Sequence, residues 1–180
     1  MKKILQLVLS LTIIAAVCAA VLATVNSVTK EQIATIKVRA TQNAAKLVMP
    51  ASVKSVEQQG EGDGVYFVGK GVDGKPIAYA LQGVSGQGYG GNIALMVGFL
   101  PDRTIVTYQK LEASETPGLG SNLTSEGFMK QFNGMSAARD ISVTKDGGDV
   151  EAITSATITS RAVCNAINTA RAKLDKILAK

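Results

Sequence analysis

A short run of small and hydroxyl-bearing residues, Thr154–Ser160, is the stretch of this chain best suited to chemistry. It follows a predicted strand and opens a long helical pattern of apolar residues. The first turn of a helix presents free backbone N–H groups, and such groups together with hydroxyls suit a phosphate. The alternative is that Thr154, Ser155 or Thr157 simply caps the helix. The local sequence leaves both interpretations open.

Two further loops contain residues that favour close contact with a ligand. The segment Gly83–Gly91 contains five glycines, which allow a close backbone approach, and the expected loop within it is Gly86–Gly91. The segment Glu115–Gly120 contains a Pro-Gly pair and a further glycine, which is typical of a tight, fixed loop. Each loop alone reads as an ordinary turn, but three loops that follow strands predict a cluster at one sheet edge. Such a cluster suits a ligand with a planar part and a phosphate, and the polar side chains expected near it are Tyr89, Glu115 and Asp102.

The composition excludes several other kinds of chemistry. The 180-residue chain contains no histidine, which removes histidine metal ligands and Ser-His-Asp triads. Cys18 lies in an apolar segment and Cys164 in a predicted C-terminal helix, so we expect neither a disulfide nor a metal cluster. The formal net charge is +5, but no basic run is interleaved with aromatic residues. Nucleic acid is therefore not an expected partner.

The N-terminal segment predicts a membrane anchor. Residues 4–29 carry no charge, and Ile4–Val25 as a helix would be about 33 Å long, enough to cross a bilayer. The two lysines before it place the N-terminus in the cytoplasm and the main domain outside. A cleaved signal peptide and a lipoprotein modified at Cys18 are the alternatives. The length of the apolar run favours an uncleaved, single-pass anchor.

The remaining sequence predicts an α+β domain with a mostly antiparallel sheet and flanking helices. We expect residues 1–28 to form the cytoplasmic start and anchor, 29–50 a connecting helix, and 51–180 the domain. Predicted strands cover 52–59, 65–68, 76–84, 92–100, 104–111, 141–144 and 150–153. An amphipathic pattern predicts helices over 121–132 and from Ile158 to the C-terminus.

These motifs together resemble a known family. Gly88-Tyr89-Gly90-Gly91, the loop Glu115–Gly120 and the signature Thr154–Thr157 follow an N-terminal anchor in that order. This arrangement is similar to the G subunit of the Rnf complex, an ion-translocating ferredoxin:NAD⁺ oxidoreductase. The C subunit of the sodium-translocating NADH:quinone oxidoreductase is a related protein. The resemblance covers the whole chain, and the loop and signature together are specific where either alone would be weak.

The resemblance implies FMN joined through its phosphate to Thr157 by a phosphoester bond. It implies that a flavin transferase installs the group outside the cytoplasmic membrane, using FAD and releasing AMP. The common signature has Asp where Glu151 stands and Gly where Ser155 stands, and serine lacks the freedom of glycine at positive φ. The expected cofactor contacts besides Thr157 are Glu115, Thr116, Gly118, Leu119, Thr154, Ser155, Ala156 and Ile158.

We therefore expect an electron-transfer subunit of a membrane ion-translocating complex, with the other membrane subunits as partners. The chain holds no NAD or ferredoxin motif, so it is not expected to be a complete enzyme alone. No residue is assigned a catalytic or metal-binding role, because the flavin supplies the redox chemistry and the protein supplies position and electrostatics. Two alternatives remain. One is a stand-alone anchored flavoprotein of another extracytoplasmic electron route, and the other is a cofactor-free anchored scaffold.

Overall fold

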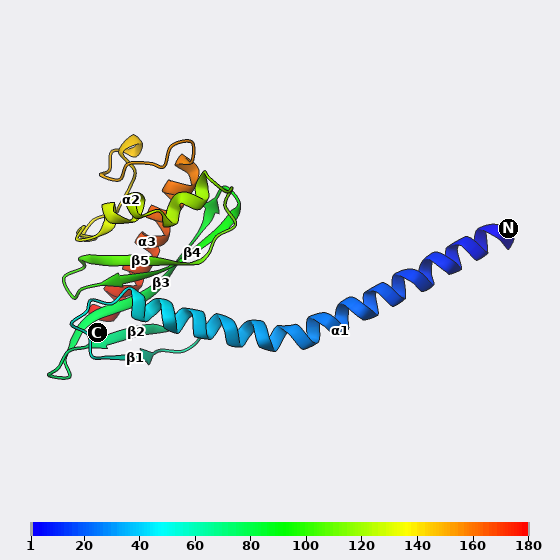
Figure 1. Ribbon diagram of the computed structural model, residues 1–180, viewed down its shortest axis with the longest axis horizontal. Coiled ribbons are helices and arrows are strands. Elements are labelled where there is room, and N and C mark those ends of the chain that lie inside the picture. Colours follow the sequence, from blue (N-terminus) through cyan, green and yellow to red (C-terminus); the bar gives the residue numbers. More distant parts are fainter. Residues whose placement is uncertain (1, 180) are drawn as a thin grey trace. The chain divides into compact units, whose positions relative to one another are not determined.

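The computed structural model describes residues 2–179, which divide into two compact units between Ala40 and Thr41. The first unit is helical and belongs to α1 (Lys2–Leu47) (Figure 1). Its most apolar 18-residue window has a mean hydropathy of 2.6, so α1 is long and apolar enough to cross a membrane. Its hydroxyls are satisfied within the helix, as where Thr12 and Thr24 donate to carbonyls four residues earlier, both at 2.8 Å. Internal satisfaction of polar groups is what a lipid environment requires.

The second unit is built on a five-stranded antiparallel sheet in which each strand pairs with the next one along the chain (Figure 1). This confirms the predicted antiparallel sheet. The strands are β1 (Ser55–Gln59), β2 (Tyr66–Lys70), β3 (Pro76–Gly88), β4 (Gly91–Phe99) and β5 (Ile105–Glu112).

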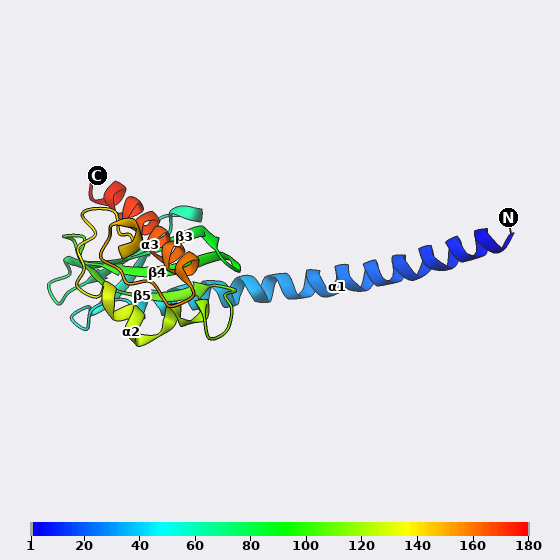
Figure 2. The ribbon, with the colours of Figure 1, turned by 90° about the horizontal axis from the view of Figure 1, so that it is seen from above.

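Both faces of the sheet are covered by apolar side chains. Successive residues of a strand point to opposite faces, and on β4 Leu95 belongs to one core while Met96 belongs to the other. Helix α3 (Thr157–Leu178) lies across the first face, as Figures 1 and 2 show from two directions. The end of α1, with Ala45, and Val48 just after it cover the second face. Burial on both sides explains why β4 is a continuous apolar run.

Two glycines let the covering helices approach the sheet closely. A Cβ atom on Gly83 in β3 would lie 1.9 Å from the carbonyl oxygen of Ala166 in α3. A Cβ atom on Gly98 in β4 would lie 2.0 Å from the carbonyl oxygen of Val48. Because real Cβ atoms do not approach oxygen so closely, these positions fix how near each helix sits to its strand.

The segment between β5 and α3 is less regular than its sequence predicts. The predicted helix over 121–132 is broken into three short pieces, η2 (Gly120–Thr124), α2 (Glu126–Met129) and η3 (Lys130–Phe132). Gly127 weakens a helix there, and Gly134, at φ 77°, ends the segment. Aromatic packing holds the pieces instead, because Phe132 meets Tyr108 and Phe128 edge-on with ring centroids 5.4 Å apart in each pair.

The two predicted strands over 141–144 and 150–153 are also wrong as strands. They are reduced to a single parallel bridge between Val143 and Val150. The turn η4 (Thr144–Asp146) and the left-handed Gly147 that follows it, with φ 81°, bring these valines together. The connection is too short to let two parallel strands align over several residues.

Candidate functional site

Helix α3 begins at Thr157, and its N-terminus has no side-chain cap. Ala156 occupies the cap position, and no described side chain makes a cap hydrogen bond there. The alternative that Thr154, Ser155 or Thr157 only caps the helix is therefore wrong. The amide of Ser160 donates to the carbonyl of Ala156 at 3.0 Å, so the three amides before it have no carbonyl acceptor within the helix. A helix start of this kind favours an anion.

The turn that leads into α3 is fixed by a buried hydroxyl. Ser160 Oγ accepts the N–H of Ile153 at 2.9 Å and donates to the carbonyl of Ala156 at 3.0 Å. The N–H of Ala156 donates to the carbonyl of Ile153 at 2.9 Å. This tight turn places Ser155 at φ 60°, in the left-handed region that favours glycine. The position at which the common signature has glycine is thus one where the backbone conformation favours it.

The carboxylate of Glu115 joins the three predicted loops. Its Oε2 accepts the hydroxyl of Thr159 at 2.7 Å, and its Oε1 accepts the N–H of Gly90 at 3.2 Å. Thr159 is buried in the first turn of α3. A Cβ atom on Gly88 would lie 2.7 Å from Oε1, and one on Gly120 would lie 2.4 Å from Oε2. The glycines therefore make the room that the carboxylate occupies.

The loop after β5 is a tight turn stabilised by its own backbone. The N–H groups of Leu119 and Ser121 both donate to the carbonyl of Thr116, at 3.2 and 3.1 Å. Gly118 takes a left-handed conformation with φ 76°, and its carbonyl accepts the side-chain amide of Asn122 at 3.0 Å. The turn leaves the Leu119 side chain 42% exposed. An apolar side chain is thus displayed beside the start of α3.

Two hollows meet at these loops and share Leu119 and Ser155. The first has a volume of about 490 Å³ and the second about 600 Å³. Both volumes lie within the range of about 300–1,000 Å³ common for small-molecule sites. The first is lined by Tyr89, Glu115, Thr116, Leu119, Gly120 and residues 155–159. The second is lined by Gly118, Leu119, Asn122, Ser125, Phe128, Gln131, Glu151, Ala152, Ile153, Thr154 and Ser155.

The structure brings the predicted cofactor contacts together around these hollows. Those lining the first hollow are Glu115, Thr116, Leu119, Ser155, Ala156, Thr157 and Ile158. Gly118 and Thr154 line the second hollow instead. Sequence reasoning missed Thr159, whose place in the first helical turn after Thr157 was a usable signal. The contact of each residue with a cofactor stays a prediction.

Asp102 lies outside the site, contrary to expectation. It belongs to the turn between β4 and β5, at the opposite end of β4 from Gly91. Its carboxylate accepts the N–H of Thr104 at 2.9 Å, and the hydrogen bonds from Thr104 lower its pKa. Asp102 is therefore a turn residue.

The predicted glycine-rich loop is mostly strand. β3 continues to Gly88 and β4 begins at Gly91, which leaves only Tyr89 and Gly90 between them. A Cβ atom on Gly90 would lie 1.7 Å from the carbonyl oxygen of Ser114. The glycine thus lets the tip of the hairpin lie against the loop after β5, where Tyr89 lines the first hollow.

The turn before α3 places a cation near Thr157. Nζ of Lys145 donates a hydrogen bond to Oγ1 of Thr157 at 3.3 Å. The neighbouring Asp146 is held by two hydrogen bonds from Arg161, both at 2.7 Å. This guanidinium lowers the pKa of the Asp146 carboxyl, and the carboxylate raises the pKa of Arg161 in return. Sequence reasoning missed Lys145, which no local pattern distinguishes.

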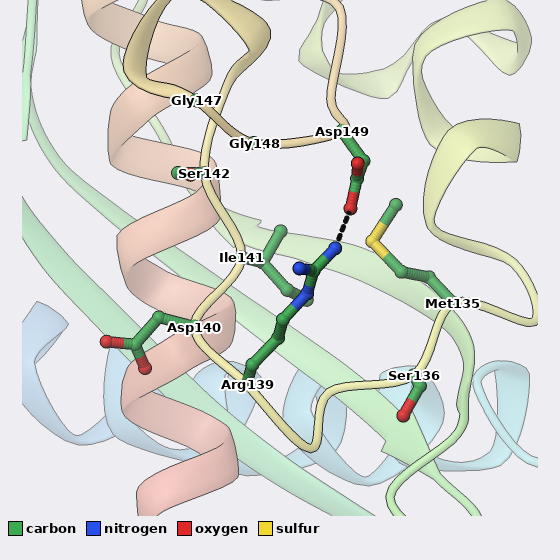
Figure 3. A pocket seen from close by; sticks show the side chains of 9 residues that line it. All are labelled: Met135, Ser136, Arg139, Asp140, Ile141, Ser142, Gly147, Gly148 and Asp149. Carbon is green, nitrogen blue, oxygen red and sulfur yellow. Dashed lines mark hydrogen bonds and ion pairs between the residues drawn. The ribbon is translucent and has the colours of Figure 1, made fainter.

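A third, smaller hollow of about 220 Å³ is lined in part by Gly147 and Gly148 of the same region. The side chains of Arg139 and Asp149 meet there in an ion pair of 2.6 Å (Figure 3). Because this pair occupies the guanidinium that an anion would need, we place the candidate site at the start of α3 instead.

The titratable groups in the core do not provide a nucleophile at neutral pH. Burial raises the pKa of the Cys164 thiol to about 12. Burial also raises the pKa of Tyr108, whose hydroxyl donates to the carbonyl of Leu123. Among the described residues, no three His, Cys, Asp or Glu side chains are placed to hold a metal ion. The arrangement therefore suits the binding of an anionic ligand better than acid–base or metal chemistry.

Residues 88–172, which include the tip of the β3–β4 hairpin, the loop after β5 and the start of α3, match the FMN-binding domain family. The fold is similar to the crystal structure of the C subunit of the Na⁺-translocating NADH-quinone reductase from Parabacteroides distasonis. The TM-score is 0.55 at 23% identity, over 71% of this chain and 79% of that one. At this identity the likeness concerns the fold.

Two relatives carry closely related names. The G subunit of the ion-translocating oxidoreductase complex of Methanosarcina acetivorans is 35% identical over 177 residues, covering 94% of this chain and 93% of the relative. The G subunit of the proton-translocating ferredoxin:NAD(+) oxidoreductase complex of Clostridium ljungdahlii is 38% identical over 101 residues, about half of each chain at 53% and 52%. With both FMN-binding sequence and near full-length similarity, this chain belongs to the family of G subunits of ion-translocating oxidoreductase complexes.

Proposed function

We propose that this chain is an electron-transfer subunit whose FMN is attached covalently, through its phosphate, to Oγ1 of Thr157. The observation that carries the proposal is the uncapped start of α3. Thr157 is the first residue of that helix, and its side chain lines the 490 Å³ hollow. The phosphate would then lie beside amides that lack helical acceptors.

The walls of the hollow suit the planar part of the cofactor. Tyr89, Leu119 and Ile158 line it and are 72%, 42% and 50% exposed, so their apolar surfaces are open to a ligand. An apolar, flat ring system would cover them, as aromatic cofactors do in concave sites. Glu115 fixes the loops on which two of these side chains lie.

FMN, once attached, supplies one- and two-electron redox chemistry, and the chain supplies its position. Thr157 holds the phosphate. Glu115 joins the surrounding loops by accepting hydrogen bonds from Thr159 and Gly90. In the attachment step we propose, Oγ1 attacks the phosphorus on the FMN side of FAD, the pyrophosphate bond breaks, AMP leaves, and the hydroxyl proton is released. A flavin transferase performs this step, and the covalent bond prevents loss of the cofactor to the medium.

The partners we propose are the other membrane subunits of an ion-translocating ferredoxin:NAD⁺ oxidoreductase. A chain of this kind would receive and pass electrons singly between neighbouring centres. We place the N-terminus in the cytoplasm, α1 across the inner membrane and the domain on the extracytoplasmic side, because Lys2 and Lys3 precede the apolar part of α1. A tag at Lys180 that is labelled from the cytoplasm would contradict this orientation.

The test is to produce the full chain with and without a flavin transferase and to measure its intact mass after denaturation. We expect a gain of one FMN less one water only with the transferase, and its loss in Thr157→Ala. Thr124→Ala is the control, since it removes an exposed hydroxyl that lines neither hollow and should keep the adduct. If the wild-type protein carries no adduct even with the transferase, the proposal is contradicted and the alternative of a cofactor-free scaffold is favoured. Co-purification with membrane subunits separates a member of a complex from a stand-alone flavoprotein.

A further inference from the structure

We propose that Lys145 is the cation that holds the FMN phosphate at Thr157. This inference rests on the proposed covalent attachment, and it adds a residue outside both the loop motif and the signature. Nζ of Lys145 lies 3.3 Å from Oγ1 of Thr157 and donates a hydrogen bond to it. The ammonium group is therefore already beside the atom to which the phosphorus would be bonded.

A short, well-fixed turn presents this side chain. Lys145 is the middle residue of η4 (Thr144–Asp146). The N–H groups of Asp146 and Gly148 both donate to the carbonyl of Val143, at 2.8 and 3.0 Å. The N–H of Thr144 donates to the carbonyl of Val150 at 2.8 Å. These bonds fix the lysine backbone within the turn, and the hydrogen bonds from Arg161 to Asp146 join the turn to α3.

The acidic neighbours of Lys145 are already paired with arginines. Asp146 accepts two hydrogen bonds from Arg161 at 2.7 Å, and Asp149 meets Arg139 at 2.6 Å (Figure 3). These five side chains together carry one net positive charge, contributed by the lysine. A phosphodiester carries a single negative charge. The proposed attachment would therefore bring the net charge of this group of side chains and the phosphate to zero.

The physical role follows from the chemistry of an ammonium group. Before attachment, the hydrogen bond from Lys145 helps to hold the Thr157 hydroxyl in one orientation. After attachment, Oγ1 is an ester oxygen, and the non-bridging phosphate oxygens become the better acceptors for the ammonium donors. The lysine then acts together with the free amides of α3 on the same charge. Because Lys145 is exposed, its contribution is screened by salt.

The test compares thermal unfolding of the full chain in detergent, with and without FMN, for wild type and three variants. Lys145→Gln removes the charge, Lys145→Arg retains it, and Lys75→Gln is the matched control in the exposed turn between β2 and β3. We expect Lys145→Gln to lower the Tm of the FMN-bearing protein by about 2–4 °C and to leave the FMN-free protein unchanged. The difference should shrink at about 1 M salt. Lys145→Arg and Lys75→Gln should behave as wild type.

A purely structural role for Lys145 would lower both Tm values equally, and that result would overturn the proposal. An unchanged Tm of the FMN-bearing Lys145→Gln protein would also overturn it. If Lys145→Gln takes up no FMN while Lys145→Arg does, the requirement for a cation is supported. If neither variant takes it up, the charge is not the deciding property and the inference fails. If the wild-type protein lacks the mass adduct, both proposals are contradicted. If the adduct forms but Lys145→Gln does not lower the Tm of the FMN-bearing protein, only the proposal for Lys145 is contradicted.

Discussion

At the scale of single residues, the site depends on side chains that hold backbone in place. Ser160 and Ile153 close the turn that ends at the first residue of α3, and Glu115 ties that helix to two loops. None of these contacts performs a reaction. Their effect is to leave Thr157 at an uncapped helix start, a position that would stabilise the phosphate of the proposed attachment.

Ser155 gives a direct test of the backbone at this turn. Its φ of 60° costs a non-glycine residue about 1–2 kcal/mol, part of which glycine would lose again as entropy of the unfolded chain. We expect Ser155→Gly to raise the free energy of unfolding by about 0.5 kcal/mol and Ser155→Val to lower it by about 1–2 kcal/mol. Urea unfolding of the FMN-free protein measures both. Equal stability of the Gly and Val variants would contradict the left-handed conformation.

We expect Glu115 to stabilise the fold by accepting the hydrogen bond from the Thr159 hydroxyl. In Glu115→Ala the hydroxyl of Thr159, which is 1% exposed, loses its acceptor. A buried hydroxyl without a partner costs about 1–3 kcal/mol, so we expect Glu115→Ala to lower the free energy of unfolding by that amount. Glu115→Gln keeps one acceptor oxygen and should lose less. The measurement is urea unfolding, with Glu115→Ala/Thr159→Val as the double variant in which the losses should not add.

At the scale of elements, α3 does two things at once. Its apolar face packs on β3 and β4, and its N-terminus faces the hollow between the loops. The depth at which it packs therefore sets where Thr157 lies. The backbone contact between Gly83 and Ala166 fixes that depth near the middle of the helix.

Gly83→Ala should push α3 away from β3. The added methyl would lie 1.9 Å from a backbone oxygen, so the helix or the strand must move, at a cost of about 2–3 kcal/mol. Gly127→Ala is the matched control, because its Cβ would meet nothing within 4 Å and alanine favours the helix α2. Chemical denaturation should show a lower midpoint for the first variant and an unchanged or higher one for the second. A Gly83→Ala protein as stable as wild type would contradict this helix–strand contact.

The elements also show what the sequence could predict. The predicted strands between residues 52 and 111 matched the antiparallel sheet, because strand and turn signals are local. The prediction of one helix over 121–132 was wrong because Gly127 weakens a helix there and the packing of Phe132 on Tyr108 exists only in the folded chain. At the site, Thr157 and the loop after β5 were found by motif. Lys145 was not, since its contact joins residues 12 positions apart and exists only in the folded chain. Thr159 was missed although it lies in the first helical turn, because its contact with Glu115, 44 positions away, also forms only on folding.

At the scale of the whole molecule, the chain combines an apolar helical unit with a compact domain that begins at Thr41. The end of α1 belongs to that domain, because Ala45 and the residue just after the helix, Val48, are fully buried against the sheet with Met96. A chain of the G-subunit family thus has, in sequence order, one helix long and apolar enough to cross a membrane and then a segment that matches the FMN-binding domain family.

Two truncations test where the domain begins. A chain that starts at Thr41 keeps the buried residues of α1 and should be soluble without detergent and unfold cooperatively. A chain that starts at Ala51 loses Ala45 and Val48 and uncovers Met96, so we expect its free energy of unfolding to fall by more than about 3 kcal/mol. Circular dichroism during urea unfolding compares them. Equal stability of the two would show that these buried residues contribute nothing.

The central claim is that one hydroxyl among several at the start of α3 bears the cofactor. Trypsin should release the peptide Asp146–Arg161, which contains Thr154, Ser155, Thr157, Thr159 and Ser160 together. Fragmentation of this peptide by electron transfer, after production of the full chain with a flavin transferase, should place one FMN less one water on Thr157 alone. An FMN located on another hydroxyl of the peptide, or a peptide that carries none, would contradict the account.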